Sequence, residues 1–286
     1  MNTLDALILG LVQGLTEFLP VSSTGHLILA REVLGLQSAE GLAVDAVLHF
    51  ATALAVLVYF RRELATLARA ALGFLAGAGI APRERTLLIA LAIGTAPAVA
   101  AGVALEGVIA STFRDPRWVV FGLVAGSLLF VGAEWIAARR SRAQNSPEEV
   151  AAAPEPVNAA TVPDITPGRG LSIGLFQALA LIPGMSRSGS TISGGLLMGL
   201  TREEAARFAF LLSIPVILGA GSLKALELGS AGVLLAQWVP LSLAFLVALL
   251  SGVGAIFFLL RFLRTNSLMV FVYYRLALAA LILVLL

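Results

Sequence analysis

Long apolar segments recur along the whole chain, and they constrain its fold more than any other feature of the sequence. Several approach the roughly 20 residues that a helix needs to cross the hydrocarbon core of a bilayer. The segments predicted to span are Val44–Phe60, Thr86–Leu105, Trp118–Ala138, Glu204–Lys224, Val233–Leu250 and Ser267–Leu286. In lipid only helices or closed barrels satisfy the backbone, so these runs predict an all-α polytopic membrane protein.

The composition agrees with this class. Of 286 residues, 59% are hydrophobic and 13% are charged, which is too little polar surface to coat a water-soluble globule of this length. The formal net charge of +2 gives no basic surface for nucleic acid. Because there is no cysteine, disulfides, zinc thiolate sites and thiol nucleophiles are excluded. Residues 1–20 lack the basic region and cleavage site of a signal peptide, and we expect them in the mature structure.

Two pairs of shorter apolar segments are each interrupted by a polar break. The first pair is Leu4–Leu19 and His26–Leu36, separated by a stretch that begins at Pro20. The second pair is Leu171–Ile182 and Thr191–Leu200. Irregular backbone is tolerated at membrane depth only where it lines a polar cavity. Both pairs are therefore predicted to be re-entrant helical hairpins.

The two halves of the chain also resemble each other. Gly10–Leu15 (GLVQGL) recurs 164 residues later as Gly174–Leu179 (GLFQAL), and each copy leads to a proline and a Ser/Gly-rich break. We therefore predict a single membrane domain, 1–286, made of two repeats at about 1–138 and about 171–286. Residues 139–170 are rich in Arg, Glu, Pro and Ala and are predicted to be a disordered cytoplasmic linker.

Basic residues predict the orientation of the spans. They gather on one side of them, which the positive-inside rule makes cytoplasmic. These residues are Arg61, Arg62, Arg69, Arg83, Arg85, Arg139, Arg140 and Arg142. Counting the crossings between the hairpins then predicts that the two hairpins enter the membrane from opposite sides. This predicts an inverted-topology repeat whose hairpins meet near the bilayer midplane.

The first break carries most of the chemistry in its half. It lies in Gln13–His26 (QGLTEFLPVSSTGH), where Gln13 and Glu17 share a helix face. A carboxylate at membrane depth is costly unless it is paired or metal-bound, so Glu17 is a functional candidate. The hydroxyls and backbone N–H groups of Ser23 and Thr24 form an anion cradle, which Gly25 leaves open to close approach, and His26 is a candidate nucleophile or general acid. Alternatively, the hydroxyls only cap a helix, and Glu17 and His26 bond each other for structure.

The second break supplies a cation. In Pro183–Ser193 (PGMSRSGSTIS), Arg187 is surrounded by hydroxyl residues, and its planar guanidinium matches phosphate oxygens. The hydroxyl residues considered as phosphate donors are Ser186, Ser188 and Thr191. A ligand-free ion pair between Arg187 and Glu17 is the alternative. His49 is expected to line a cavity or bond a carbonyl, and Arg275 is interpreted as a packing cation, with a phosphate role left open.

On these two stretches the chain resembles the bacterial undecaprenyl-diphosphatases of the bacitracin-resistance type. The resemblance implies hydrolysis of undecaprenyl diphosphate to the monophosphate and phosphate, which recycles the lipid carrier of peptidoglycan synthesis. It implies that Glu17 and Gln13 assist a divalent cation, Mg²⁺ or Ca²⁺, or activate water, and that Ser23 and His26 attack or shuttle protons. Arg187 would clamp the diphosphate, with Ser186, Ser188 and Thr191 donating hydrogen bonds.

The same resemblance implies a bacterial cell-membrane protein whose site opens to the extracytoplasmic side, with a homodimer in some cases. One position departs from the family pattern, because Gln13 stands where many relatives have Glu, and this leaves a single carboxylate in the motif. A second function class remains open. Inverted repeats with broken helices are also typical of a secondary transporter or flippase for an anionic lipid or solute, which would release no phosphate.

Overall fold

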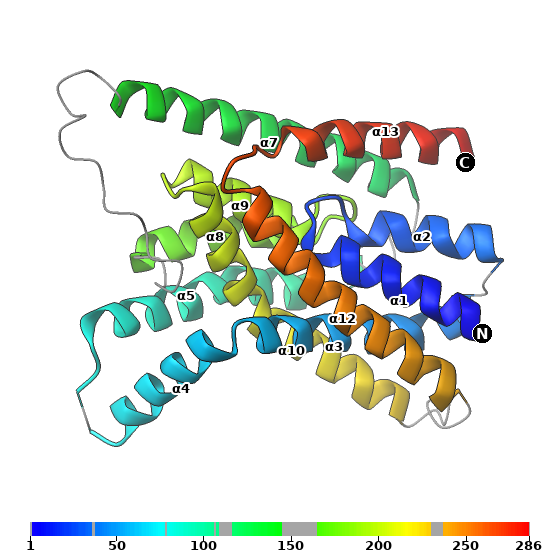
Figure 1. The fold of residues 1–286 in the computed structure, drawn as a ribbon, viewed down its shortest axis with the longest axis horizontal. Helices are drawn as coiled ribbons and strands as arrows, with labels where there is room; N and C mark the ends of the chain where they lie inside the picture. The colour runs from blue at the N-terminus through cyan, green and yellow to red at the C-terminus, as the bar shows by residue number, and fades with distance from the viewer. Residues whose placement is uncertain are drawn as a thin grey trace.

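The computed structural model of the chain describes residues 2–35, 38–77, 79–105, 107–108, 116–144, 165–229 and 237–285. Within these ranges the regular secondary structure is entirely helical, as predicted (Figure 1). The helices are α1 (Thr3–Phe18), α2 (Ser23–Leu34), α3 (Ser38–Tyr59), α4 (Arg61–Leu75), α5 (Pro82–Ala104), α7 (Pro116–Gln144), α8 (Pro167–Leu179), α9 (Arg187–Leu197), α10 (Arg202–Gly229), α12 (Trp238–Phe262) and α13 (Met269–Leu285).

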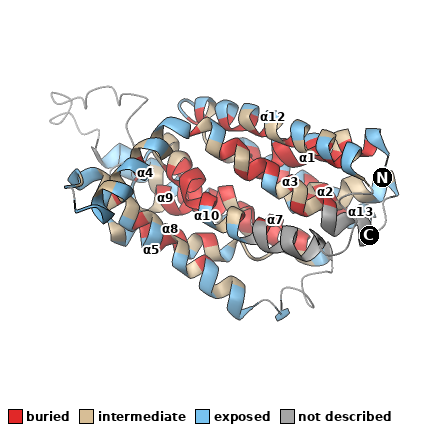
Figure 2. Cartoon of the chain, turned by 90° about the horizontal axis from the view of Figure 1, so that it is seen from below, coloured by how far each residue is buried: buried red, intermediate tan, exposed pale blue. Residues whose placement is uncertain are grey.

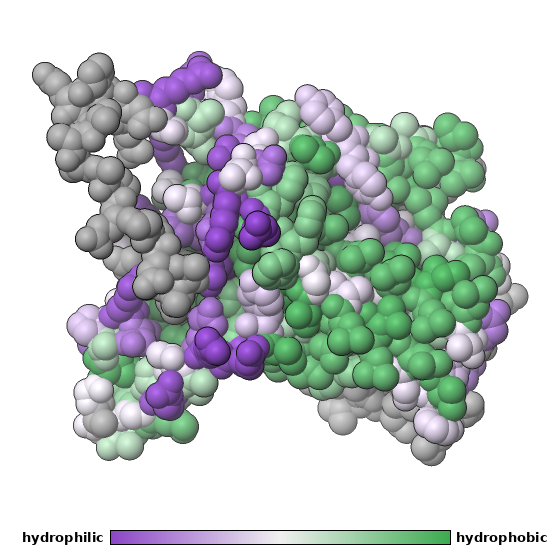
Figure 3. Space-filling view, in the orientation of Figure 1, coloured by the Kyte–Doolittle hydropathy of each residue, from purple (hydrophilic) through white to green (hydrophobic). Residues whose placement is uncertain are grey.

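Helices long and apolar enough to cross a membrane are α5, α7 and α12 among the described residues. A fourth crossing is possible where α3 continues into α4, although the two helices meet at an 82° bend. Apolar residues also cover a broad part of the outer surface, while polar residues gather toward one end (Figure 3). A folded chain that exposes this much apolar surface is a multi-pass membrane protein.

The halves of the chain interleave through the first helix of each hairpin. Helix α1 packs along α12, and α8 packs along α5, so each hairpin lies against a helix of the other half. The backbones approach closely: a Cβ on Gly10 would lie 2.5 Å from the carbonyl oxygen of Ala244, and one on Gly174 would lie 2.1 Å from that of Gly94. Small residues that allow such contact are typical of helix packing in membranes.

The second helix of the later hairpin forms part of the core. Every residue of α9 from Ser188 to Leu196 is buried. Buried residues likewise follow α10 and the inner side of α12 (Figure 2). The polar break before α9 is therefore held in the interior of the bundle rather than on its surface.

The predicted linker is shorter than 139–170. Helix α7 continues to Gln144 because Arg139 lies over the Trp135 ring, 3.6 Å from its centroid, and Arg140 donates to the carbonyl of Leu197 at 2.6 Å. Helix α8 begins earlier than predicted, at Pro167, a residue whose fixed φ suits a first helical position. The rest of the predicted linker, 145–164, lies outside the described residues.

Candidate active site

The two polar breaks meet. The Arg187 guanidinium, at the start of α9, forms an ion pair with the Glu17 carboxylate near the end of α1. The Ser188 hydroxyl also donates to the carbonyl of Leu19 at 3.3 Å. The prediction that these distant stretches fold onto each other is therefore confirmed. The ion pair itself matches the alternative in which Arg187 and Glu17 neutralise each other, so the surroundings must decide whether a ligand also binds here.

Both breaks contain a serine in the same strained conformation. Ser22 has φ 71° and Ser186 has φ 68°, and they are the only non-glycine residues with positive φ in the described part of the chain. They lie 164 residues apart, which is the offset of the sequence repeat, and each is the N-cap of the helix that follows. Strained backbone of this kind concentrates at functional sites.

These two N-caps face one cavity of about 190 Å³. Its polar lining comes from both breaks and from α1, α3 and α8, and consists of Glu17, Ser22, Ser23, Thr24, His49, Gln177, Ser186 and Arg187. The N-terminus of α2 has no side-chain cap. Its first backbone N–H groups therefore remain available, and the positive ends of α2 and α9 adjoin the same space. Converging N-termini beside a guanidinium form an anion site.

Glu17 lies at the centre of the hydrogen bonds in this cavity and is 8% exposed. Its Oε2 accepts from Gln13 Nε2 at 3.0 Å and from the Ser23 hydroxyl at 2.8 Å, while Oε1 accepts from Arg187. Because every partner donates, the contacts favour the ionised carboxylate. The Ser23 hydroxyl is thus held with its proton directed at a base.

His49 reaches the same group from α3. Its Nδ1 lies 3.2 Å from Gln13 Nε2 and 3.8 Å from Glu17 Oε2. The ring lines the cavity, one of the two placements expected from the sequence. It contacts side chains of the candidate site, whereas sequence reasoning gave it no chemical role.

His26 contacts Ser22 and Tyr274 rather than Glu17. Its Nδ1–H donates to the Ser22 carbonyl at 2.8 Å, and its Nε2 accepts from the Tyr274 hydroxyl at 2.6 Å. The two rings stack, with centroids 5.5 Å apart. His26 does not line the cavity as the described residues form it, nor does any described contact join it to Glu17.

Three other predicted site residues have structural partners. The Thr191 hydroxyl donates to the carbonyl of Arg187 at 2.8 Å, within its own helix. Ser186 Oγ accepts from the backbone N–H of Gly189 at 3.3 Å. Gly25 is buried, and a Cβ there would lie 3.2 Å from Val119, so its small size serves the packing of α2 on α7.

Gln177 lines the cavity and was not predicted as a site residue. It is 2% exposed, and within the part of the chain that the structure describes neither Nε2 nor Oε1 has a hydrogen-bond partner. A buried amide without partners is costly, and its position suits a ligand that both accepts and donates. The sequence repeat could have indicated Gln177 as a site residue, because it is the counterpart of Gln13 at the offset of 164 residues.

Arg275 holds the two breaks together. The side chain is fully buried and donates to the carbonyl oxygens of Pro20 at 3.4 Å and Gly184 at 3.0 Å. These two residues are again 164 positions apart. Further bonds reach α7, at the carbonyls of Gly122 and Leu123 and the hydroxyl of Ser127. The interpretation of Arg275 as a packing cation agrees with these contacts.

The donors in this cavity do not form a metal site by themselves. No group of three or more His, Asp or Glu side chains is placed to hold a metal ion within the described ranges. Both Glu17 oxygens already accept hydrogen bonds. Gln13 Oε1 is buried without a partner among the described residues, so Glu17 and Gln13 could share a cation only with oxygens brought by a ligand.

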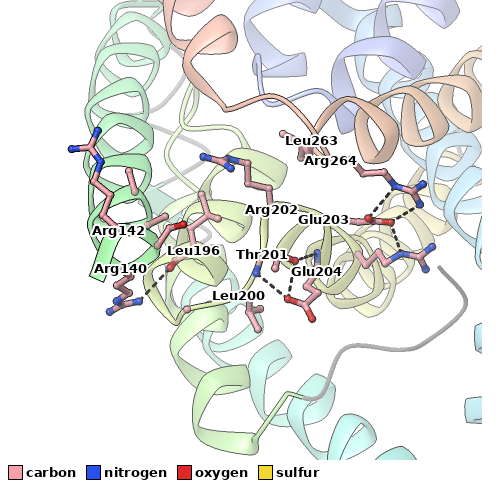
Figure 4. Close-up of a pocket in the computed structure, with 15 residues that line it drawn as sticks. Arg140, Arg142, Leu196, Leu200, Thr201, Arg202, Glu203, Glu204, Leu263 and Arg264 are labelled. Atoms are coloured by element: carbon pink, nitrogen blue, oxygen red, sulfur yellow. Dashed lines mark hydrogen bonds and ion pairs between the residues drawn. The ribbon is translucent and has the colours of Figure 1, made fainter. Parts of the chain in front are cut away.

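A second, larger cavity of about 750 Å³ lies between the end of α7 and the start of α10 (Figure 4). Several of its charged side chains form ion pairs: Arg264 binds Glu203 at 2.8 Å, and Arg202 binds Glu134 at 2.6 Å. A mutually paired arrangement of this kind ties helix ends together and competes with ligand binding. We therefore place the candidate active site in the smaller cavity.

The fold defines a polytopic membrane protein, and the polar lining of its smaller cavity suits an anion. Residues 6–281 match the family described as bacitracin resistance protein BacA. The undecaprenyl-diphosphatase of Rubrobacter xylanophilus is 42% identical over 284 residues, covering 99% of this chain and 97% of the relative. The undecaprenyl-diphosphatase of Myxococcus xanthus is 42% identical over 295 residues, covering 100% and 90%. The chain belongs to the BacA family.

Proposed function

We propose that this protein is an integral membrane phosphatase that hydrolyses undecaprenyl diphosphate to undecaprenyl phosphate and inorganic phosphate. This reaction recycles the lipid carrier for peptidoglycan synthesis and gives bacitracin resistance. The observation that supports it best is the Glu17–Arg187 pair at the meeting point of two helix N-termini. A base and a phosphate-binding cation lie together in an apolar surrounding, where the prenyl tail can stay in lipid.

In the proposed reaction the terminal phosphate binds Arg187 and the free N–H groups at the start of α2. Phosphate oxygens compete with Glu17 for the guanidinium, which releases the carboxylate to act as a base. Either the Ser23 oxygen or a water oxygen attacks the terminal phosphorus, and Glu17 takes its proton. The bond to the bridging oxygen then breaks, and its electron pair leaves with the lipid monophosphate. If Ser23 is the attacking group, a water molecule then cleaves the phosphoserine O–P bond, which releases inorganic phosphate and returns the proton to Ser23.

A divalent cation, Mg²⁺ or Ca²⁺, is part of the proposal. It would be held by Glu17, with Gln13 Oε1, together with oxygens of the diphosphate. Such an ion neutralises charge on transferring phosphoryl groups. The single carboxylate supports a cation that binds together with the substrate rather than ahead of it.

We further propose that the site opens to the extracytoplasmic side of the bacterial cell membrane. The hairpins α1–α2 and α8–α9 would enter from opposite sides and meet near the midplane. The support is the packing of each hairpin on a helix of the other half and the placement of basic residues along the chain. A homodimer is compatible with the exposed apolar faces.

The proposed activity predicts phosphate release by the purified protein. In detergent with undecaprenyl diphosphate and Mg²⁺, we expect stoichiometric lipid monophosphate and inorganic phosphate, measured by chromatography and phosphate assay. EDTA should suppress both products, and added Mg²⁺ or Ca²⁺ should restore them. Binding of the lipid without any phosphate release would instead favour the transporter or flippase.

Gln177 is predicted to bind the diphosphate head. Replacing it by Leu should raise KM by about 10- to 100-fold, the effect of losing one hydrogen bond to a charged group, with a smaller change in kcat. Ser193→Ala is the matched control, because Ser193 is also buried, has no hydrogen-bond partner among the residues that the structure describes, and does not line the cavity. Equal effects of the two substitutions would contradict the assignment.

A further inference from the structure

The Gln13 amide links the carboxylate of the site to an imidazole. Its Nε2 donates to Glu17 Oε2 at 3.0 Å and lies 3.2 Å from His49 Nδ1. The orientation of this amide is fixed by Glu17, since the reverse would place Oε1 against an ionised carboxylate. Both hydrogens of the amide nitrogen are then used, one on Glu17 and the other on His49.

This bond determines where the proton of His49 lies. A nitrogen that accepts from an amide N–H carries no proton, so Nδ1 is the acceptor and the neutral ring holds its hydrogen on Nε2. In a doubly protonated ring, the Nδ1–H and the amide N–H would be two donors facing each other, which is unfavourable. His49 lines the cavity, and its side chain is 43% exposed in the isolated chain. Its remaining N–H is therefore available to a ligand.

The charged groups around His49 balance one another. Glu17 on α1 would attract a protonated ring, but it is already paired with Arg187 from α9. One turn earlier on α3, Asp45 is paired with Arg31 from α2. The contact that orients the His49 ring is therefore the hydrogen bond from Gln13.

We propose that His49 is a catalytic residue that donates a hydrogen bond from Nε2–H, as a neutral ring, to a phosphoryl oxygen of the bound diphosphate, and that Gln13 is the positioning residue that holds this tautomer. This inference rests on the proposed phosphatase function. The inference also explains what a Gln, rather than a Glu, contributes at position 13. A Glu there would accept from Nδ1–H and move the proton away from Nε2, the atom that the ligand needs.

Histidine ring spectra test the tautomer without any activity measurement. The chain has two histidines, so His26→Gln leaves His49 as the only signal. In the His26→Gln protein labelled with ¹⁵N-histidine, we expect His49 to show the Nε2–H tautomer. In the double variant His26→Gln/Gln13→Glu, we expect the His49 signal to shift to the Nδ1–H or doubly protonated form. Two results would overturn the proposal. One is an Nδ1–H tautomer of His49 in the His26→Gln protein, and the other is an unchanged His49 spectrum when Gln13→Glu is added.

Kinetics test the donor role. His49→Leu should lower kcat/KM by about 10- to 100-fold, as expected for one lost hydrogen bond to a charged oxygen. His49→Gln, whose amide can place an N–H near the same point, should recover part of that loss.

The controls separate this inference from the phosphatase proposal. Equal activity of His49→Leu and the wild type would overturn the donor role. Absence of phosphate release from the wild type would instead reject the proposed function, and the spectra would still report whether Gln13 fixes the ring.

Discussion

Replacing Glu17 by Gln is expected to lower phosphate release by about 10²- to 10⁴-fold, the range usual for a general base. The isosteric amide keeps one acceptor oxygen, so it can accept from Arg187 or from Ser23 but not from both, and it cannot take a proton from the attacking oxygen. Initial rates with undecaprenyl diphosphate, at saturating and subsaturating lipid, would show the loss in kcat. Retention of more than a tenth of the wild-type kcat would contradict the assignment of Glu17.

Stability must be measured beside activity, because Glu17→Gln leaves Arg187 as a partly buried cation without its counter-ion. Breaking a buried pair from one side costs about 3–5 kcal/mol in general. The double substitution Glu17→Gln/Arg187→Met removes both charges and should recover much of the thermal stability in detergent. Because both partners of the site are then missing, its activity should stay as low as that of the single variant.

Replacing Arg275 by Met is expected to destabilise the protein strongly, by at least about 3 kcal/mol. The guanidinium serves several buried acceptors, among them the carbonyls of Pro20 and Gly184, and each buried acceptor left unpaired costs about 1–3 kcal/mol. A marked fall in the thermal unfolding temperature in detergent checks this. Arg264→Met is the control, because Arg264 pairs with Glu203 at an exposed position and should matter little.

Arg275→Lys distinguishes positioning from simple stability. Lysine keeps the charge but has fewer donors in a different geometry, so it cannot hold both breaks as the guanidinium does. We expect folded protein whose kcat is about 10²-fold lower, the cost of a misplacement of about 1 Å at a reacting centre. Full activity in a stable Arg275→Lys protein would show that the alignment of the breaks does not depend on this bond network.

Local patterns in the sequence were enough to predict the helices and their breaks. Apolar runs and the prolines that end them predicted short helices such as α1 and α9 and long spans such as α12. The cost of a charge in lipid singled out Glu17 and Arg187, and their meeting followed from the need of each for a partner. These predictions depend on what any apolar surrounding demands of a polar group.

The contacts that depend on helix rotation could not be predicted in this way. His26 bonds Tyr274, 248 residues away, and nothing near His26 in sequence indicates that partner. His49 was placed beside a carbonyl or a cavity, because the face of α3 that meets α1 is decided by packing across the bundle. Gln177 could have been found earlier, since the repeat that matched it to Gln13 was already visible.

The positive φ of Ser22 and Ser186 has a further consequence for what each half of the chain contributes to the cavity. The residue that follows each kink is Ser23 in one half and Arg187 in the other, so an inherited backbone presents a hydroxyl on one side and a permanent cation on the opposite side. The two halves share the backbone conformation at these positions but differ in the side chain that follows it. Two copies of either half would offer a pair of like groups, whereas the single, unequal chain places a hydroxyl and a cation beside the same cavity.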